Sequence, residues 1–318
     1  MLRVDVFTNM SSKINTQKDQ ANLRVAQRDF KYYIFDWDDN ILHMPTRIHL
    51  EKKNDDGLWE PYNVSTAMFA IIRNDTANYR PPRGDWSRAF VEFQDLDEDS
   101  GSESGFISDT RHALEPIVAG REKPGPSFEQ FKQALIEGRL FAIVTARGHS
   151  SDTLRKGVRF FIDRVLDDME LKLMIANLRG YWECFEKEHH VFSDDEMIER
   201  YLDLNRYHAV TSPEFAGRMR VAPAGANRAE FAKQLAIRDF VDHIMSIVRS
   251  KNIQRPVSIG FSDDDSGNVA AAENYMREEL GRLYPGMKFV VYNTSDVSRE
   301  PSRKVVVQGQ LSFDLGDL

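Results

Sequence analysis

The chain has 318 residues, of which 41% are hydrophobic and 29% charged, a balance typical of a folded globular protein. No apolar run approaches the roughly 18 residues that a membrane helix needs, so we expect no membrane insertion. The net charge of -8 and the isoelectric point near 5.6 argue against a broadly basic nucleic-acid surface.

Two features of the chain bear on its cellular location. The only cysteine, Cys184, cannot form an internal disulfide. The first residues, Met1 to Val6, lack the basic segment and apolar core of a secretory signal. We therefore expect a reducing, cytoplasmic environment.

The N-terminal part contains a polar leader followed by one short apolar strand. Residues 1–30 are rich in polar side chains, and we expect a partly flexible leader. The stretch 31–36 is apolar up to Asp36, where the sequence turns abruptly into the acidic run Asp36-Trp37-Asp38-Asp39. A buried strand that ends in carboxylates is typical of a site at the carboxyl edge of an α/β sheet.

Residues 43–125 are expected to form a first insert, made of a hairpin and a loop. The segment Arg47 to Val64 alternates between apolar and polar residues and breaks at Asp56-Gly57. This pattern predicts a β-hairpin, because Asp-Gly supplies the positive φ that tight turns require. The acidic, Ser- and Gly-rich region 95–109 is expected to be an exposed loop.

Helical and extended patterns alternate through the rest of the chain. Helices are predicted at 127–137, 151–166, 229–248 and 268–283, and strands at 140–144, 207–211, 257–261 and 287–292. Such alternation predicts an α/β fold, a Rossmann-like parallel sheet with helices on both faces. The charged segment 167–206 is expected to be a second, helical insert. In the tail, 294–318, residues 304–313 alternate and are expected to pair on a sheet edge.

Three of the predicted strands end in polar residues. Asp36 and Asp38 follow the first strand, Thr145 ends the second, and Asp263 and Asp264 follow the strand that begins at 257. These residues should meet at one edge, because the carboxyl ends of parallel strands lie together. Carboxylates so close repel one another unless a cation lies among them, and Mg²⁺ suits oxygen ligands.

The order of these motifs resembles that of the haloacid dehalogenase-like phosphohydrolase superfamily. Phe35-Asp36-Trp37-Asp38-Asp39-Asn40-Ile41-Leu42 is similar to the nucleophile motif of the family. Ile143-Val144-Thr145-Ala146-Arg147-Gly148 is similar to the second motif, and Gly260-Phe261-Ser262-Asp263-Asp264-Asp265 to the fourth. The resemblance covers roughly 30–42, 128–166 and 207–293 and does not explain the two inserts.

The resemblance implies a role for each site residue. Asp36 would be the nucleophile that forms an aspartyl-phosphate, and Asp38 the general acid and base. Thr145 would hydrogen-bond a phosphate oxygen. Mg²⁺ would be held by the Asp36 carboxylate, the Asp38 carbonyl and the acids Asp263 and Asp264.

A lysine should neutralise the nucleophile and the phosphate. Lys233 is the first choice, because it lies early in the helix before the strand that starts at 257. Three other cations compete with it for this role: Arg228, Lys156 and Arg238.

One departure from the family concerns the turn after Asp38. This chain has Asp39-Asn40 where the family usually has a small pair such as Gly-Thr. The Asn40 side chain can still hydrogen-bond and cap the turn, so we expect modest consequences.

The sequence therefore predicts a Mg²⁺-dependent phosphatase that hydrolyses a phosphomonoester, with a small molecule as the expected substrate. The 43–125 insert, with its aromatic and basic stretch near Trp86, is favoured for substrate selection. One alternative is a non-catalytic metal- or phosphate-binding regulatory module on the same fold. Another is a polynucleotide-end phosphatase, so nucleic acid stays open as a partner. The substrate and the oligomeric state are not determined by the sequence.

Overall fold

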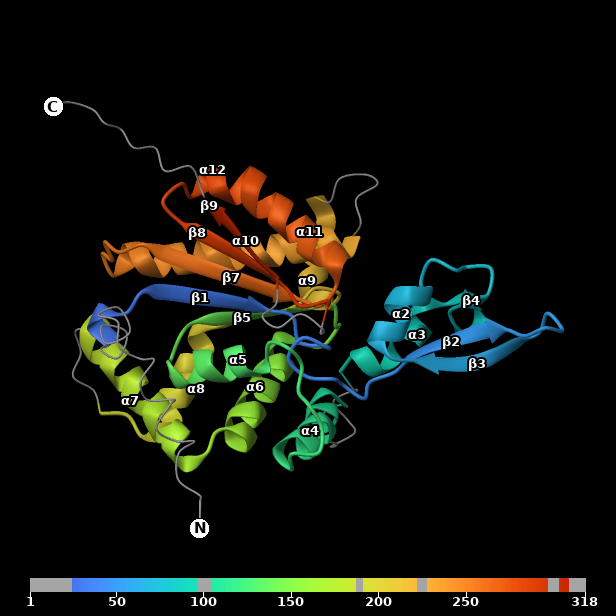
Figure 1. Cartoon of the computed structure of the whole chain (residues 1–318), viewed down its shortest axis with the longest axis horizontal. Helices are drawn as coiled ribbons and strands as arrows, with labels where there is room; N and C mark the ends of the chain where they lie inside the picture. The colour runs from blue at the N-terminus through green and yellow to red at the C-terminus, as the bar shows by residue number, and fades with distance from the viewer. Residues whose placement is uncertain (1–24, 96–104, 187–190, 222–227, 297–302, 309–318) are drawn as a thin grey trace, which may run out of the picture.

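A six-stranded sheet forms the centre of the molecule in the computed structural model, which describes residues 25–95, 105–186, 191–221, 228–296 and 303–308 (Figure 1). Its strands are β1 (Phe30–Phe35), β5 (Phe141–Thr145), β6 (Arg206–Ala209), β7 (Val257–Asp263), β8 (Lys288–Asn293) and β9 (Arg303–Gln308). They lie in the order β6-β5-β1-β7-β8-β9. All pairs are parallel except β8 with β9. The predicted parallel sheet is confirmed.

Helices cover both faces of this sheet, as predicted. One layer contains α4 (Gly105–Val118), α5 (Phe128–Ile136), α6 (Ser151–Val165), α7 (Asp168–Phe185) and α8 (Asp194–Leu204). The other contains α9 (Pro213–Ala216), the 3₁₀ turn η5 (Gly217–Val221), α10 (Arg228–Ser250), α11 (Ser266–Tyr275), the π turn η6 (Met276–Leu280) and α12 (Gly281–Leu283). Successive strand residues serve the two layers alternately: Ile143 packs into the first and Val144 into the second.

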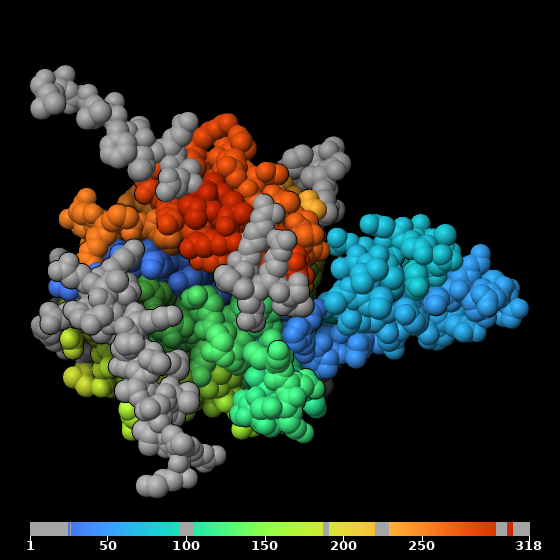
Figure 2. Space-filling view, viewed as in Figure 1, coloured from blue at the N-terminus to red at the C-terminus, as the bar shows by residue number. Residues whose placement is uncertain are grey.

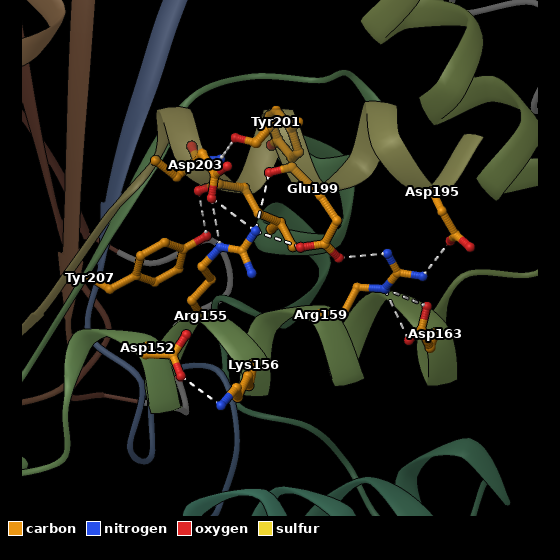
Figure 3. A network of polar contacts seen from close by, with 12 residues as sticks. Asp152, Arg155, Lys156, Arg159, Asp163, Asp195, Glu199, Tyr201, Asp203 and Tyr207 are labelled. Atoms are coloured by element: carbon orange, nitrogen blue, oxygen red, sulfur yellow. Dashed lines mark hydrogen bonds and ion pairs between the residues drawn. The ribbon is translucent and has the colours of Figure 1, made fainter. Parts of the chain in front are cut away.

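The segment 167–206, which the sequence analysis treated as a helical insert, contributes α7 and α8 to the helical layer on one face of the sheet. Buried residues of α7 and α8, among them Leu178 and Ile198, belong to the same hydrophobic core as α5 and α6. Three acids of α8, Asp195, Glu199 and Asp203, form an ion-pair network with Arg155 and Arg159 of α6 (Figure 3). There Glu199 accepts hydrogen bonds from both Arg155 and Arg159. These charges join neighbouring helices of one layer.

Part of the first insert folds as a small unit, the inserted module (residues 48–93). It contains β2 (Ile48–Lys53), β3 (Trp59–Val64), α2 (Thr66–Ile72), β4 (Tyr79–Arg80), η2 (Pro82–Gly84), α3 (Trp86–Ala89) and η3 (Val91–Phe93). The predicted hairpin is confirmed: β2 and β3 are antiparallel, and Gly57 in the turn has a φ of +81°. The module has a hydrophobic core of its own and projects from the carboxyl end of the main sheet (Figures 1 and 2).

The first insert contains more helix than expected. Besides α2 and α3, helix α4 starts at Gly105, so the loop predicted at 95–109 is wrong for residues 105–109, and 96–104 lie outside the described residues. Phe106, Thr110, Ala113 and Leu114 are buried at helical spacing. The Ser and Gly content of the region obscured this apolar stripe.

The predicted leader and tail both contribute to the folded body. Val25–Gln27 form a 3₁₀ turn, and the buried Arg28 donates a hydrogen bond to the carbonyl of Glu137. In the tail, β9 confirms the predicted edge pairing for 304–308; residues 1–24 and 309–313 lie outside the described ranges. Among the helices in the described ranges, none is long and apolar enough to cross a bilayer.

Candidate active site

Two strand ends and one helix meet around Lys233. Its Nζ lies 2.8 Å from Oδ1 of Asp36 and 2.6 Å from Oδ2 of Asp263. Asp36 follows β1 and Asp263 ends β7, and these strands are neighbours in the sheet. The side chains of all three residues are buried. The expected convergence of these strand ends is therefore present.

The other cations considered for this role lie elsewhere. Lys156 is exposed on α6 and pairs with Asp152, while Arg238 on α10 pairs with Asp242. Arg228 begins α10, and its side chain lies outside the described part of the structure. Among the described side chains, Lys233 is the cation that contacts Asp36.

Three carboxylates form a group that could hold a metal ion. Asp36, Asp263 and Asp264 each offer an oxygen, and these oxygens lie within 4.8 Å of one another. Asp263 is oriented by the backbone N–H of Asp265, which donates to Oδ1 over 2.9 Å. Asp265 itself caps α11 by accepting from the N–H of Gly267. A compact set of carboxylate oxygens fits the preference of Mg²⁺ for hard ligands.

Burial and mutual repulsion change the proton affinity of this group. Burial raises the pKa of Asp36 well above its ordinary value, Lys233 opposes the shift, and Asp263 adds to it. Burial, with Asp263 and Asp39, raises the pKa of Asp264 to about 7. Burial alone would lower the pKa of Lys233, but Asp263 and Asp36 raise it, so the ammonium stays charged. A divalent cation would compete with protons for these carboxylates.

Asp38 points into a different environment. Arg147 donates to both of its carboxylate oxygens, from Nη2 over 2.6 Å and from Nε over 2.8 Å. The hydroxyl of Thr145 donates to the same carboxylate over 3.2 Å. The Asp38 carbonyl, which the resemblance assigns to the metal, accepts from the N–H of Asn40. The Asp38 carboxylate is therefore a partner of the second motif rather than a member of the metal group.

Sequence reasoning gave Arg147 no role. Its side chain is completely buried. The available signal was its position two residues after Thr145, within the segment quoted as the second motif. A buried arginine at the carboxyl end of a central strand requires an acidic partner, and here that partner is Asp38.

Asn40 holds the loop after β1 in place. Its amide nitrogen donates to the carbonyls of Asp36 and Ser262, over 3.1 and 3.2 Å. Its amide oxygen accepts from the hydroxyls of Ser127 and Thr294, over 2.8 and 2.9 Å. The predicted capping role is confirmed, and its extent is larger than the sequence indicated, because four separate segments meet on this one side chain.

The inserted module contacts the site through α2. The hydroxyl of Thr66 donates to Asp39 over 2.5 Å, and Arg73, directly after α2, lies 3.5 Å from Asp265. Asp39 adopts a left-handed conformation with a φ of +54°, which an aspartate tolerates better than most residues. His43 also bonds the Asp39 carboxylate, over 2.9 Å. The module therefore lies against the loops that follow β1 and β7.

The aromatic and basic stretch near Trp86 serves mainly the module itself. Arg80 stacks over the ring of Trp59, 4.2 Å from its centroid, and donates to Glu51. Trp86 is 47% exposed and stacks with Phe90. The Arg80 guanidinium is thus already paired within the module.

Comparison of the chain with known proteins finds no relative. No family model matches the chain, and neither the curated proteins nor the solved structures contain a significant match. What the site can do chemically follows from its own residues.

Proposed function

We propose that this protein is a Mg²⁺-dependent phosphatase of the haloacid dehalogenase-like type, which hydrolyses a phosphomonoester through an aspartyl-phosphate on Asp36. The observation that carries the proposal is the buried Lys233 between Asp36 and Asp263, at the ends of two adjacent parallel strands. A cation beside a candidate nucleophile offsets the repulsion that an incoming phosphate would otherwise meet.

Asp36 is suited to attack because its position is fixed. Lys233 holds one carboxylate oxygen, and the backbone N–H of Asp36 donates to the carbonyl of Ser262 over 3.0 Å. In the first step a carboxylate oxygen of Asp36 forms a bond to phosphorus while the ester P–O bond breaks. Asp38 gives a proton to the leaving oxygen. In the second step Asp38 takes a proton from water, whose oxygen displaces Asp36 and releases phosphate.

The acidic group supports a metal requirement. Asp36, Asp263 and Asp264 would hold the ion, and when bound it supplies positive charge to the phosphate oxygens. Lys233 bonds one oxygen of Asp36 and one of Asp263, so the other oxygen of each carboxylate is not used by this lysine.

Phosphate release provides the test. Wild type and Asp36→Asn are incubated, with and without Mg²⁺, with an aryl phosphate, a panel of phosphorylated metabolites and an oligonucleotide carrying a terminal phosphate. Asp152→Asn, an exposed acid on α6, is the matched control. We expect Mg²⁺-dependent release that Asp36→Asn abolishes and Asp152→Asn retains.

Two outcomes would contradict the proposal. Equal release by Asp36→Asn and wild type would exclude Asp36 as nucleophile. No release from any substrate, with Mg²⁺ binding detected by calorimetry, would favour the non-catalytic binding module.

A further inference from the structure

The contact between Arg147 and Asp38 has a specific geometry. The guanidinium donates from two nitrogens to the two oxygens of one carboxylate, over 2.6 and 2.8 Å, and Arg147 is fully buried. Such a two-point contact fixes the plane of the carboxyl group as well as its position. Asp38 is the acid that the phosphatase proposal uses for proton transfer, so its orientation determines how well it reaches the leaving oxygen.

Arg147 also lies where the inserted module joins the body. Its Nη2 donates to the hydroxyl of Thr46, in the segment that enters the module, over 2.7 Å. Thr46 in turn donates to Asp109 on α4. The ring of Phe93, at the end of the module, lies 4.8 Å from the guanidinium carbon, and the Phe93 carbonyl accepts from the N–H of Gly148 over 2.9 Å. The chain segment that enters the module and the residue at its end therefore both touch Arg147 or its loop.

A purely stabilising role explains this arrangement poorly. The remaining guanidinium nitrogen, Nη1, is buried and has no hydrogen-bond partner among the described residues; the guanidinium carbon lies 4.8 Å from the ring of Phe93 and 5.2 Å from that of Phe106. Contact with aromatic rings offsets only part of the cost of burying a donor without a hydrogen bond. A buried ion pair is in any case weak evidence for stability, because desolvation offsets the attraction. The pair is better explained by what it does to Asp38.

We infer that Arg147 is a positioning residue that sets the orientation of the Asp38 carboxyl group and couples it, through Thr46 and Phe93, to the position of the inserted module. The inference rests on the proposed phosphatase function. It predicts that a variant lacking Arg147 is defective in proton donation by Asp38. The size of this defect should depend on the leaving group. A phenolate with electron-withdrawing groups leaves without a proton, whereas an alkoxide needs one.

The test compares an aryl phosphate that has a good leaving group with an alkyl phosphate. Arg147→Lys keeps the charge but cannot hold the carboxylate at two points. We expect kcat/KM for the alkyl phosphate to fall roughly 100-fold and that for the aryl phosphate less than about fivefold, because general acid catalysis contributes that much only where a proton is needed. Arg139→Lys, at a buried arginine paired with Glu137, is the matched control and should change the two substrates equally.

Thr46→Val tests the coupling to the module. It removes the hydrogen bond from Arg147 and the one that Thr46 donates to Asp109, and we expect a selective loss of about fivefold on the alkyl phosphate. Equal losses on both substrates in Arg147→Lys would overturn positioning and indicate phosphate binding instead, while the phosphatase proposal would stand. If the ratio of kcat/KM for the alkyl and aryl phosphates is unchanged in Thr46→Val, the coupling is overturned. If Arg147→Lys shows no cooperative thermal transition and so does not fold, Thr46→Val alone decides the inference. A wild type inactive on both substrates would remove the phosphatase proposal and the inference together.

Discussion

Lys233 and Asp36 are 197 residues apart in the sequence, yet the lysine Nζ lies 2.8 Å from the aspartate carboxylate in the interior of the protein. The contact exists because β1 pairs with β7 and α10 packs on the face of the sheet that both strands share. One ammonium therefore compensates two buried carboxylates, those of Asp36 and Asp263.

Replacing this lysine should affect both stability and activity. Lys233→Met leaves the carboxylates of Asp36 and Asp263 buried without their cation, so we expect the free energy of unfolding to fall by about 3 to 5 kcal/mol. Phosphate release should fall more than about 100-fold, because the positive charge beside the phosphate is lost. Thermal denaturation and phosphate release measure the two effects. Lys156→Met, at an exposed lysine, should change neither, and near-normal turnover by Lys233→Met would contradict the assigned role.

Magnesium binding should depend on pH. The pKa of Asp264 is raised to about 7 and that of Asp36 is also raised, so both carboxyls hold protons more tightly than ordinary carboxyls do. Below neutral pH, Mg²⁺ must displace these protons. Between pH 5 and 7 its affinity should therefore increase with pH, by up to about tenfold per pH unit for each proton displaced. Calorimetric titrations at pH 5.5, 6.5 and 8 measure this. Asp264→Asn should bind more weakly with a shallower pH dependence, and a pH-independent affinity in the wild type would count against the site.

The metal-free protein should respond to pH in the opposite direction at this group. Because the folded state binds the Asp264 proton more tightly than the unfolded state does, the contribution of this carboxyl to stability falls as pH rises from about 4 to about 7. Added Mg²⁺ should offset that loss, which denaturation with and without the ion would reveal.

His149 predicts acid sensitivity of the fold. It is fully buried, neither ring nitrogen has a hydrogen-bond partner among the described residues, and burial, followed by the charge of Arg147, lowers its pKa to about 4. Between pH 6.5 and 4 the His149 side chain binds a proton in the unfolded state but stays neutral in the folded state. Stability contributed by the neutral ring is therefore complete above pH 6.5 and lost towards pH 4, by up to about 3 kcal/mol.

The variant His149→Leu should remove this component. Urea denaturation at pH 5 and pH 7.5 should show a smaller difference between the two pH values for His149→Leu than for the wild type. His112, exposed on α4, provides the control variant His112→Gln, which should behave as the wild type does. Identical pH differences in all three proteins would contradict the assignment.

The network between α6 and α8 should make a modest, salt-dependent contribution (Figure 3). Glu199 lies 2.5 Å from Arg155 and 2.9 Å from Arg159, and its side chain is 44% exposed. We expect Glu199→Gln to lower the free energy of unfolding by about 1 kcal/mol at low salt, and by less in 1 M NaCl, because exposed charges are screened. Asp152→Asn breaks an isolated pair with Lys156 on α6 and should have a smaller effect. A loss that does not change with salt would show that packing, rather than charge, is responsible.

The sequence predicted the parts of the fold that depend on local pattern. The hairpin at 47–64 was recognisable from its alternation and from Asp56-Gly57, and the central strands from short apolar runs. Helix α4 was missed because Ser and Gly obscured its apolar stripe, and the charged composition of 167–206 did not reveal that α7 and α8 pack into the main core. Composition reports exposure only on average, whereas packing depends on which face of a helix carries the apolar residues.

By itself, the sequence determined that three strand ends carry Asp36, Thr145 and Asp263, and that a parallel sheet would gather them at one edge. Only the tertiary structure showed that the Lys233 ammonium lies between Asp36 and Asp263, where the sequence had offered Lys233 among four cations, and that Arg147 holds Asp38. The physical reason is that periodicity and turn chemistry act over a few residues, within one element. Partners of buried charges depend instead on the order of strands in the sheet and on the direction of each side chain, which packing of the whole chain establishes.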